Sequence, residues 1–291
     1  HLPYVLHRKD RWQVAHIYRR RAKPEEQAPQ YSHIHFTSDL EEVLNDPLVK
    51  LVVVCTHADS HFEYAKKALE AGKNVLVEKP FTPTLEEAKT LFALANSKGL
   101  TVTPYQNRRF DSCFLTTKKV IESGKLGELV EIESHFDNYR PLAETNPGGP
   151  QNGEFYGLGV HTLDQIISLF GRPDHVSYDL RSLRNKANPD DTFEAQLFYG
   201  DMKAIVKTSH LVQIDYPKFI VHGHKGSFVK YGIDQQETSL KANIMPGEPG
   251  FGADDSVGEL VYVNEAGEMV REAVPLESGD YGRVYDALYD T

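Results

Sequence analysis

The sequence predicts an α/β domain with a doubly wound parallel sheet, followed by an α+β domain with a large antiparallel sheet. In the first 105 residues, short apolar runs alternate with helical segments. In the remainder, several strand-like runs follow one another closely and two helices interrupt them. Alternating strands and helices form parallel sheets through right-handed crossovers, whereas neighbouring strands joined by turns form antiparallel sheets. We therefore expect one domain at residues 1–105 and a second at residues 106–291.

The first domain should contain five strands. Their expected ranges are Gln13–Tyr18, Ile34–Phe36, Leu51–Cys55, Asn74–Val77 and Leu100–Thr103. The run Leu51–Cys55 (LVVVC) is apolar throughout and mostly β-branched, which is typical of a strand covered on both faces of a parallel sheet.

Three helix starts in this domain carry the pattern of a capping box, in which two side chains satisfy each other's free backbone amides. The pairs are Ser38 with Glu41, Ser60 with Glu63, and Thr84 with Glu87. The second and third of these helices should end at Gly72 and near Gly99, because glycine readily adopts the left-handed conformation that follows a helix.

The second domain should consist of strands joined by Gly, Asp and Asn turns, with helices on one face of the sheet. The expected strands are Val130–Asp137, Val176–Arg184, Thr192–Tyr199, Met202–Val212 and Lys218–Tyr231. The two helices are expected at about Arg109–Ser123 and about Glu154–Phe170.

Composition excludes several classes of protein. The net charge of −10 argues against a nucleic-acid partner, since such proteins need a basic face. No window approaches 18 uninterrupted apolar residues, and the first residues do not form a signal peptide, so we expect no membrane association. Cys55 and Cys113 lie far apart without metal-type spacing, which favours a reduced, cytoplasmic protein.

Both ends of the chain look cut. A doubly wound dinucleotide-binding domain normally opens with a strand and a G-x-G-x-x-G turn, and the sequence contains no such turn. It also stops inside a helical pattern that begins near Tyr281. We therefore expect the first strand, the Gly-rich loop and the C-terminal end to be absent.

The strand Asn74–Val77 is followed directly by Glu78-Lys79-Pro80 and then by a capped helix. Ligands of open α/β sheets bind at the carboxyl ends of the strands, so Lys79 is a candidate for a binding or catalytic role. The alternative is a surface lysine before a proline turn. We also expect the Lys79–Pro80 bond to be cis, as in tight turns at functional sites.

Several segments besides this motif resemble one known family. They are Ala68 to Val75 (ALEAGKNV), Arg108 to Asp111 (RRFD), Gly157 to Gln165 (GLGVHTLDQ) and Phe219 to Tyr231 (FIVHGHKGSFVKY). The chain resembles the glucose-fructose oxidoreductase/inositol dehydrogenase (Gfo/Idh/MocA) family, in the branch that includes scyllo-inositol dehydrogenases. The resemblance implies a Rossmann-type first domain, an NAD(P)-dependent dehydrogenase acting on CH–OH groups, and a homodimer or higher homo-oligomer built on the open face of the second sheet.

The resemblance also implies catalytic roles. Lys79 would lie between nicotinamide and substrate, where it would act as acid/base and stabilise the developing alkoxide. His161 would be its partner at the substrate, although a buried structural histidine is the alternative. One position departs from the pattern: catalytic members usually carry Asp four residues before this histidine, and this chain has Gly157. Asp164, three residues after His161, is a possible substitute.

The cofactor should be NADP, with NAD possible. Arg19-Arg20-Arg21 follow the strand expected at Gln13–Tyr18, which would be the second strand of a complete dinucleotide-binding domain, and no acid is present there. Guanidinium groups fit a 2′-phosphate, whereas an acid would bind the ribose of NAD. The alternative is a solvated basic turn. The resemblance adds further site residues. Cofactor-binding residues would be Arg19, Arg20, Thr56, His57, Glu78, Lys79, Pro80, Gln106 and Asn107, and substrate-facing residues would be Arg109, Asp111 and Tyr139.

The remaining histidines point to no metal site. His61 is more typical of packing, and the pairs His33/His35 and His222/His224 have no acid or cysteine to complete a set. We therefore expect an NADP(H)-dependent oxidoreductase acting on a polyol, sugar or cyclitol, with no metal. A non-catalytic NADP or sugar sensor on the same scaffold is the alternative, and reduction of another carbonyl-like group, such as an imine or enone, is a second.

Overall fold

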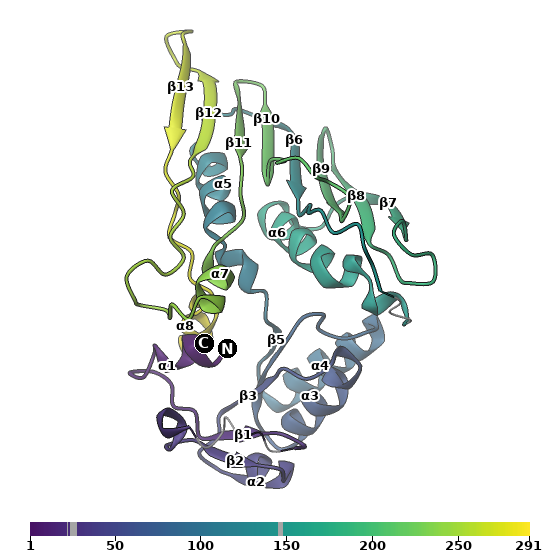
Figure 1. Cartoon of the computed structure of the whole chain (residues 1–291), viewed down its shortest axis with the longest axis vertical. Coiled ribbons are helices and arrows are strands. Elements are labelled where there is room, and N and C mark those ends of the chain that lie inside the picture. The colour runs from purple at the N-terminus through teal and green to yellow at the C-terminus, as the bar shows by residue number, and fades with distance from the viewer. Residues whose placement is uncertain (22, 24–27, 145–147) are drawn as a thin grey trace. The chain divides into compact units, whose positions relative to one another are not determined.

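A computed structural model describes residues 1–21, 23, 28–144 and 148–291. The chain forms two compact units, residues 1–105 together with 284–291, and residues 106–283 (Figure 1). Residues 284–291 therefore belong to the first unit, although they were expected in the second domain. Among the described residues, no helix is both long enough and apolar enough to cross a membrane.

Five strands are present among the described residues of the first unit, and they pair in parallel, as predicted. Strands β1 (His16–Tyr18) and β2 (His35–Thr37) form one pair. Strands β3 (Leu51–Val54), β4 (Asn74–Val77) and β5 (Val102–Pro104) form a three-stranded sheet. Parallel order places the carboxyl ends of β3 and β4 at the same edge of their sheet, which brings together the loops that follow them.

Helices cover this sheet and supply its core. The helices of the unit are α1 (Leu2–Leu6), α2 (Leu40–Asn45), α3 (His61–Glu70), α4 (Leu85–Lys98) and α8 (Arg283–Tyr289). Helices α3 and α4 lie side by side (Figure 1). Leu69 and Leu91 of these helices pack with Val54, Val75 and Val77 in one buried cluster. Because the strand side chains are apolar on both faces, they need this cover.

Only one of the three expected capping boxes forms. Thr84 and Glu87 make both reciprocal bonds at the start of α4. At α2 the prediction was wrong, because Asp39 rather than Ser38 caps the helix, through its Oδ1 and the amide of Glu41 (2.9 Å). Ser60 also makes no cap bond. Both left-handed glycines were predicted correctly, with φ of 77° at Gly72 and 64° at Gly99.

The C-terminal helix α8 is held in the first unit by α1 and the residues after it. Arg8 donates to both carboxylate oxygens of Asp286 at 2.9 Å. Trp12 Nε1 donates to the carbonyl of Tyr285 at 3.2 Å, and the Tyr285 ring is 1% exposed. These contacts join residues almost a whole chain length apart, which explains why no local pattern indicated them.

The second unit contains an eight-stranded sheet. Its strands are β6 (Leu129–His135), β7 (His175–Arg181), β8 (Thr192–Tyr199), β9 (Met202–Ser209), β10 (Phe219–Gly223), β11 (Gly226–Lys230), β12 (Gly258–Val263) and β13 (Met269–Val274). The order is β13-β12-β11-β10-β6-β9-β8-β7. All neighbours are antiparallel except β6 and β9, which are parallel. The long connection that carries α6 between them provides the crossover that a parallel pair needs.

Two corrections apply to the expected second domain. The single run predicted at Lys218–Tyr231 is a hairpin of β10 and β11, and strands β12 and β13 were not predicted. Helices α5 (Ser112–Glu122) and α6 (Val160–Phe170) lie along the sheet (Figure 1), and α7 (Gln236–Lys241) follows β11. Val120 of α5 and Ile166 of α6 pack against Ile132, Ala204 and Val221 of the sheet in a single core cluster.

Candidate active-site residues in the two units

The loop after β4 carries Glu78, Lys79 and Pro80. The Glu78 amide donates to the carbonyl of Val54 at 2.8 Å, which continues the β3–β4 pairing by one bond. The Lys79 amide donates to Oε2 of Glu78 at 2.9 Å, and the Lys79–Pro80 bond is cis, as expected. Lys79 therefore stands on a backbone that its neighbours hold at the carboxyl edge of the sheet.

His61 links this loop to the one that follows β3. Its Nδ1 lies 2.8 Å from the carbonyl oxygen of Pro80, and its Nε2 lies 3.0 Å from the carbonyl oxygen of Thr56. The residue is 1% exposed. Ser60 supports the same loop through bonds to Thr56 Oγ1 and the His57 carbonyl, both at 2.8 Å. His61 is thus a packing residue, as expected, and it ties together two loops that carry predicted cofactor residues.

The basic segment after β1 is accessible. Arg19 is half-buried and its amide donates to the Thr37 carbonyl at 3.0 Å, whereas Arg20 and Arg21 are exposed. Guanidinium groups at a strand end suit a phosphate, so the donor set fits the cofactor that the sequence predicts. In the second unit, Gln106 has a buried Oε1 with no hydrogen-bond partner among the described residues. An acceptor of this kind fits the amide of a nicotinamide.

His161 and Asp164 lie at the start of α6, after a π-helical segment at Phe155–Gly159. Single turns of π-helix occur often at functional sites. His161 is 4% exposed. Asp164 accepts two bonds from Arg109, from Nε and Nη2, both at 2.7 Å. Because its carboxylate is engaged by a guanidinium, Asp164 is a poor replacement for the acid missing at residue 157.

Asp111 occupies the interior of the second unit, contrary to the expectation that it faces substrate. It is 1% exposed and accepts bonds from the Tyr281 hydroxyl (2.6 Å) and from Arg108 Nη1 (3.4 Å). Burial raises the pKa of Asp111 to about 6, against the opposing effect of Arg108. Gln165 Nε2 also reaches this carboxylate, at 3.4 Å. Asp111 therefore belongs to a buried network of the second unit and is not part of the proposed site.

The other expected side chains show mixed surroundings. Tyr139 is 48% exposed and bridges to Leu211, so it is available to a ligand. Neither histidine pair lies on one strand, because His33 precedes β2 and His224 follows β10. Among the described residues, no group of three or more His, Cys, Asp or Glu side chains could hold a metal ion.

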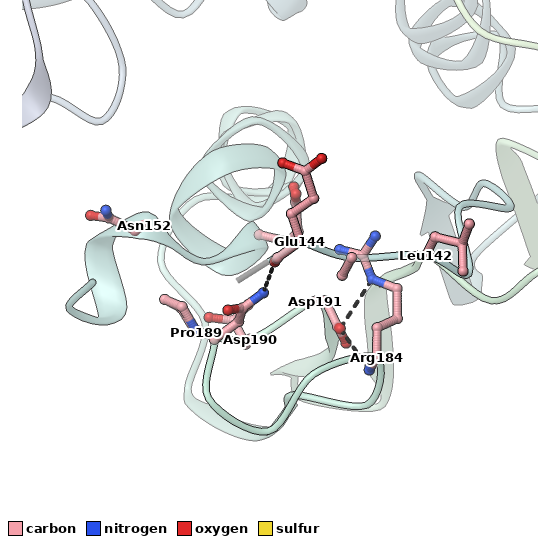
Figure 2. Close-up of a pocket in the computed structure, with 10 residues that line it drawn as sticks. Leu142, Glu144, Asn152, Arg184, Pro189, Asp190 and Asp191 are labelled. Atoms are coloured by element: carbon pink, nitrogen blue, oxygen red, sulfur yellow. Dashed lines mark hydrogen bonds and ion pairs between the residues drawn. The ribbon is translucent and has the colours of Figure 1, made fainter. Parts of the chain in front are cut away.

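A polar pocket of the second unit was not predicted. It has a volume of about 290 Å³. It is lined by Leu142, Ala143, Glu144, Asn152, Glu154, Arg184, Asn188, Pro189, Asp190 and Asp191. Figure 2 shows the bonds that shape it: Asp191 accepts from the amide and Nε of Arg184, and Asn188 donates to the carbonyl of Glu144. The segments meet only in the folded unit, so no local spacing could indicate the pocket.

Comparison with known proteins agrees with the fold and the motif. Residues 1–106 match the NAD-binding Rossmann fold of the GFO/IDH/MocA oxidoreductase family, and residues 118–291 match its C-terminal alpha/beta domain. The chain is 85% identical over 291 residues to the uncharacterized oxidoreductase YhhX of Escherichia coli K12, covering 100% of this chain and 84% of YhhX. A crystal structure of a probable oxidoreductase yhhX, at the same identity, has a TM-score of 0.99 and covers 100% of this chain and 85% of that one.

A more distant relative has a stated activity. The chain is 35% identical over 287 residues to IolW of Bacillus subtilis 168, a scyllo-inositol 2-dehydrogenase (NADP(+)), covering 97% of this chain and 79% of IolW. The family matches include all of β1–β13, and the motif at Glu78–Pro80 falls within the NAD-binding part. The chain belongs to the Gfo/Idh/MocA family of oxidoreductases.

Proposed function

We propose that this oxidoreductase is NADP(H)-dependent and transfers hydride to or from a polyol, sugar or cyclitol, in the manner of a scyllo-inositol dehydrogenase. The observation that carries the proposal is Lys79, placed after β4 on a loop held by Glu78 and by the Pro80–His61 contact. A lysine fixed at the carboxyl edge of a dinucleotide-binding sheet lies where substrates of such sheets bind. The named activity of the relative IolW supports the same chemistry.

The nicotinamide cofactor, when bound, accepts or donates the hydride. The Lys79 ammonium would hydrogen-bond the substrate hydroxyl and stabilise the alkoxide that develops at the same oxygen. His161 of the second unit would be its partner at the substrate. Arg19 and Arg20 would hold a 2′-phosphate, Thr56, His57 and the loop Glu78–Pro80 would contact the rest of the cofactor, and Gln106 and Asn107 would contact the carboxamide.

Three features support the preference for NADP, the cytoplasmic location and the homo-oligomeric state. The exposed guanidinium groups after β1 suit a phosphate, and the relative IolW carries NADP(+) in its name. Both cysteines are free thiols, which fits a reducing, cytoplasmic compartment. Strand β7 leaves Val176, Tyr178 and Leu180 at least 40% exposed, which suits a surface that pairs in a homodimer or larger homo-oligomer.

A screen of nicotinamide absorbance against sugars and cyclitols tests this proposal, with scyllo-inositol included and with Lys79→Met as the matched variant. We expect NADP-linked turnover by the wild type and a loss of about 10²- to 10⁴-fold in kcat for Lys79→Met, which removes the acid/base group but keeps the chain length. The affinity for NADPH should fall much less than kcat, because the phosphate contacts of Arg19 and Arg20 remain.

The rival is a non-catalytic sensor of NADP or a sugar, which Gly157 favours because a glycine supplies no carboxylate beside His161. A sensor would bind NADPH, consume no substrate, and lose only ligand affinity in Lys79→Met. That set of results would overturn the enzymatic proposal.

A further inference from the structure

Four carboxylates line the polar pocket of the second unit, and two of them, Asp190 and Asp191, bind neighbouring groups of the chain. Asp190 accepts a bond from the Phe155 amide at 2.7 Å and thereby anchors the start of the π-helical segment. Asp191 binds the backbone and guanidinium of Arg184. Glu144 is an exposed side chain at the rim. The remaining carboxylate, Glu154, is partly buried and stands just before the helical segment that leads to His161.

A buried histidine holds Glu154. The Nε2 of His210, whose side chain is 4% exposed, lies 2.9 Å from Oε1 of Glu154, at an angle outside the hydrogen-bond range. The other ring nitrogen, Nδ1, lies 2.5 Å from Oδ1 of Asn138. The two nitrogens thus face two oxygens, one on Asn138 and one on Glu154. The contact keeps one oxygen of the Glu154 carboxylate beside a buried side chain, while the Glu154 side chain remains 31% exposed.

Gly157 makes room for that carboxylate. A Cβ built on Gly157 would lie 3.2 Å from Oε2 of Glu154, which is tighter than ordinary van der Waals contact. The φ of Gly157 is not in the left-handed region, so the backbone does not require glycine here. The absence of a side chain at residue 157 is therefore explained by the space that Glu154 occupies one turn earlier.

Glu154 also influences its surroundings in the pocket. Burial raises the pKa of Asp190, and the Glu154 carboxylate adds to that rise. Acidic side chains outnumber the single guanidinium, that of Arg184, in the lining, which makes the pocket unfavourable for an anion because like charges repel. Hydroxyl groups can instead donate to carboxylate oxygens in charge-assisted bonds.

We propose that Glu154, held by His210 and admitted by Gly157, is the carboxylate of this pocket that accepts hydrogen bonds from substrate hydroxyls and excludes anionic substrates. The identity of the ligand as a polyol rests on the proposed function. The site thereby gains a specificity-determining residue, and its preferred substrates are neutral polyols rather than sugar acids or sugar phosphates.

A set of four variants tests this inference with scyllo-inositol as the neutral probe and an inositol monophosphate as the anionic probe. Glu154→Ala should lower kcat/KM for the neutral probe about tenfold to a hundredfold, mainly through KM, as loss of a charge-assisted bond does. The ratio of kcat/KM for the anionic over the neutral probe should rise. Gly157→Ala should act in the same direction, and the double variant should be no worse than Glu154→Ala. Glu122→Gln, at the exposed end of α5, should leave both values unchanged.

The inference is overturned if Glu154→Ala matches the wild type on both probes, or if the effects of Glu154→Ala and Gly157→Ala are additive. If the wild type turns over no polyol, sugar or cyclitol, the proposed function fails. Denaturant unfolding of the wild type, Glu154→Ala, Gly157→Ala and the double variant still decides the coupling. Gly157→Ala should then destabilise the protein only when Glu154 is present. Equal effects of Gly157→Ala in both backgrounds would reject the pairing of Glu154 with Gly157.

Discussion

In the first unit, predicted site residues such as Glu78, Lys79 and Pro80 are consecutive in a loop. In the second unit, the positions of the predicted site residues are fixed by side chains from segments far away in the sequence. Lys79 is positioned by Glu78 next to it and by the contact of Pro80 with His61, at the start of the preceding helix α3. Asp111 is positioned by Tyr281, 170 residues away. The first arrangement can be seen in a motif of three residues, and the second cannot be seen in any local segment.

The same contrast distinguishes residues that are accessible to a ligand from residues that belong to the interior of the fold. The residues that lie at the strand ends of the first unit are accessible and fit a cofactor, while one predicted substrate residue of the second unit, Asp111, belongs to a buried network. Arg108 of the same segment belongs to this network too: it is 7% exposed and contacts Asp111, Tyr281 and Glu237. A charged side chain in a matching family segment is therefore a site residue only where the fold leaves it accessible.

The largest expected effect is on stability, and two adjacent arginines provide a matched comparison. Arg108→Met should lower the free energy of unfolding by about 3–5 kcal/mol, because it leaves the buried Asp111 without its guanidinium. Arg109→Met should cost less than about 1 kcal/mol, because the ion pair of Arg109 with Asp164 involves a side chain that is 49% exposed. Denaturant titration of both variants measures the difference. Equal losses would show that the buried network is no more important than the surface pair.

A pH titration of the free energy of unfolding tests the burial of Asp111 in a second way. The pKa of Asp111 is raised from 3.8 to about 6, so between these values the folded protein holds a proton that the unfolded chain has lost. This contribution to the free energy of unfolding is present below about pH 4 and is lost as the pH rises towards 6, by up to about 3 kcal/mol. Asp111→Asn should lack that step. Parallel pH profiles for the two proteins would contradict the assignment.

Cofactor selectivity should depend on the accessible arginines of the first unit. Replacing Arg19 and Arg20 together by Ala should weaken NADPH binding about tenfold to a hundredfold, as loss of charge-assisted phosphate contacts does, and leave NADH binding nearly unchanged. Arg172→Ala, which removes an exposed arginine of the second unit, serves as the control. Fluorescence titration with both cofactors gives the comparison. If both cofactors weaken equally, the triplet is only a solvated basic turn.

The smallest expected effect concerns helix caps in the first unit. Thr84→Ala should destabilise the protein by about 1 kcal/mol, because it removes one side of the capping box at α4. Ser38→Ala should cost less than about 0.5 kcal/mol, since Asp39 makes the cap at α2. Thermal or denaturant unfolding measures both variants. A larger loss for Ser38→Ala would mean that the observed cap at α2 is misassigned.

Features that depend on residues close together in the sequence were predicted correctly more often than features that depend on distant residues. The strand Asn74–Val77, the cap at Thr84, the left-handed Gly72 and Gly99, and the cis bond at Pro80 were all predicted, and each depends on residues within a few positions of one another. The hairpin of β10 and β11 was merged into one strand, although Gly223-His224-Lys225-Gly226 has the composition of a turn and could have indicated it.

The sequence by itself determined the alternation of strands and helices in the first unit, the two-part architecture, the motif that carries Lys79 and the family. Side-chain alternation, caps and turn residues act over a few positions and need no knowledge of the rest of the chain. Only the tertiary structure decided that β6 and β9 pair in parallel, that Asp111 is buried against Tyr281, and that Glu154 meets His210. These contacts join segments far apart in the chain, and their pairing depends on the order of strands in the sheet, which local spacing does not encode.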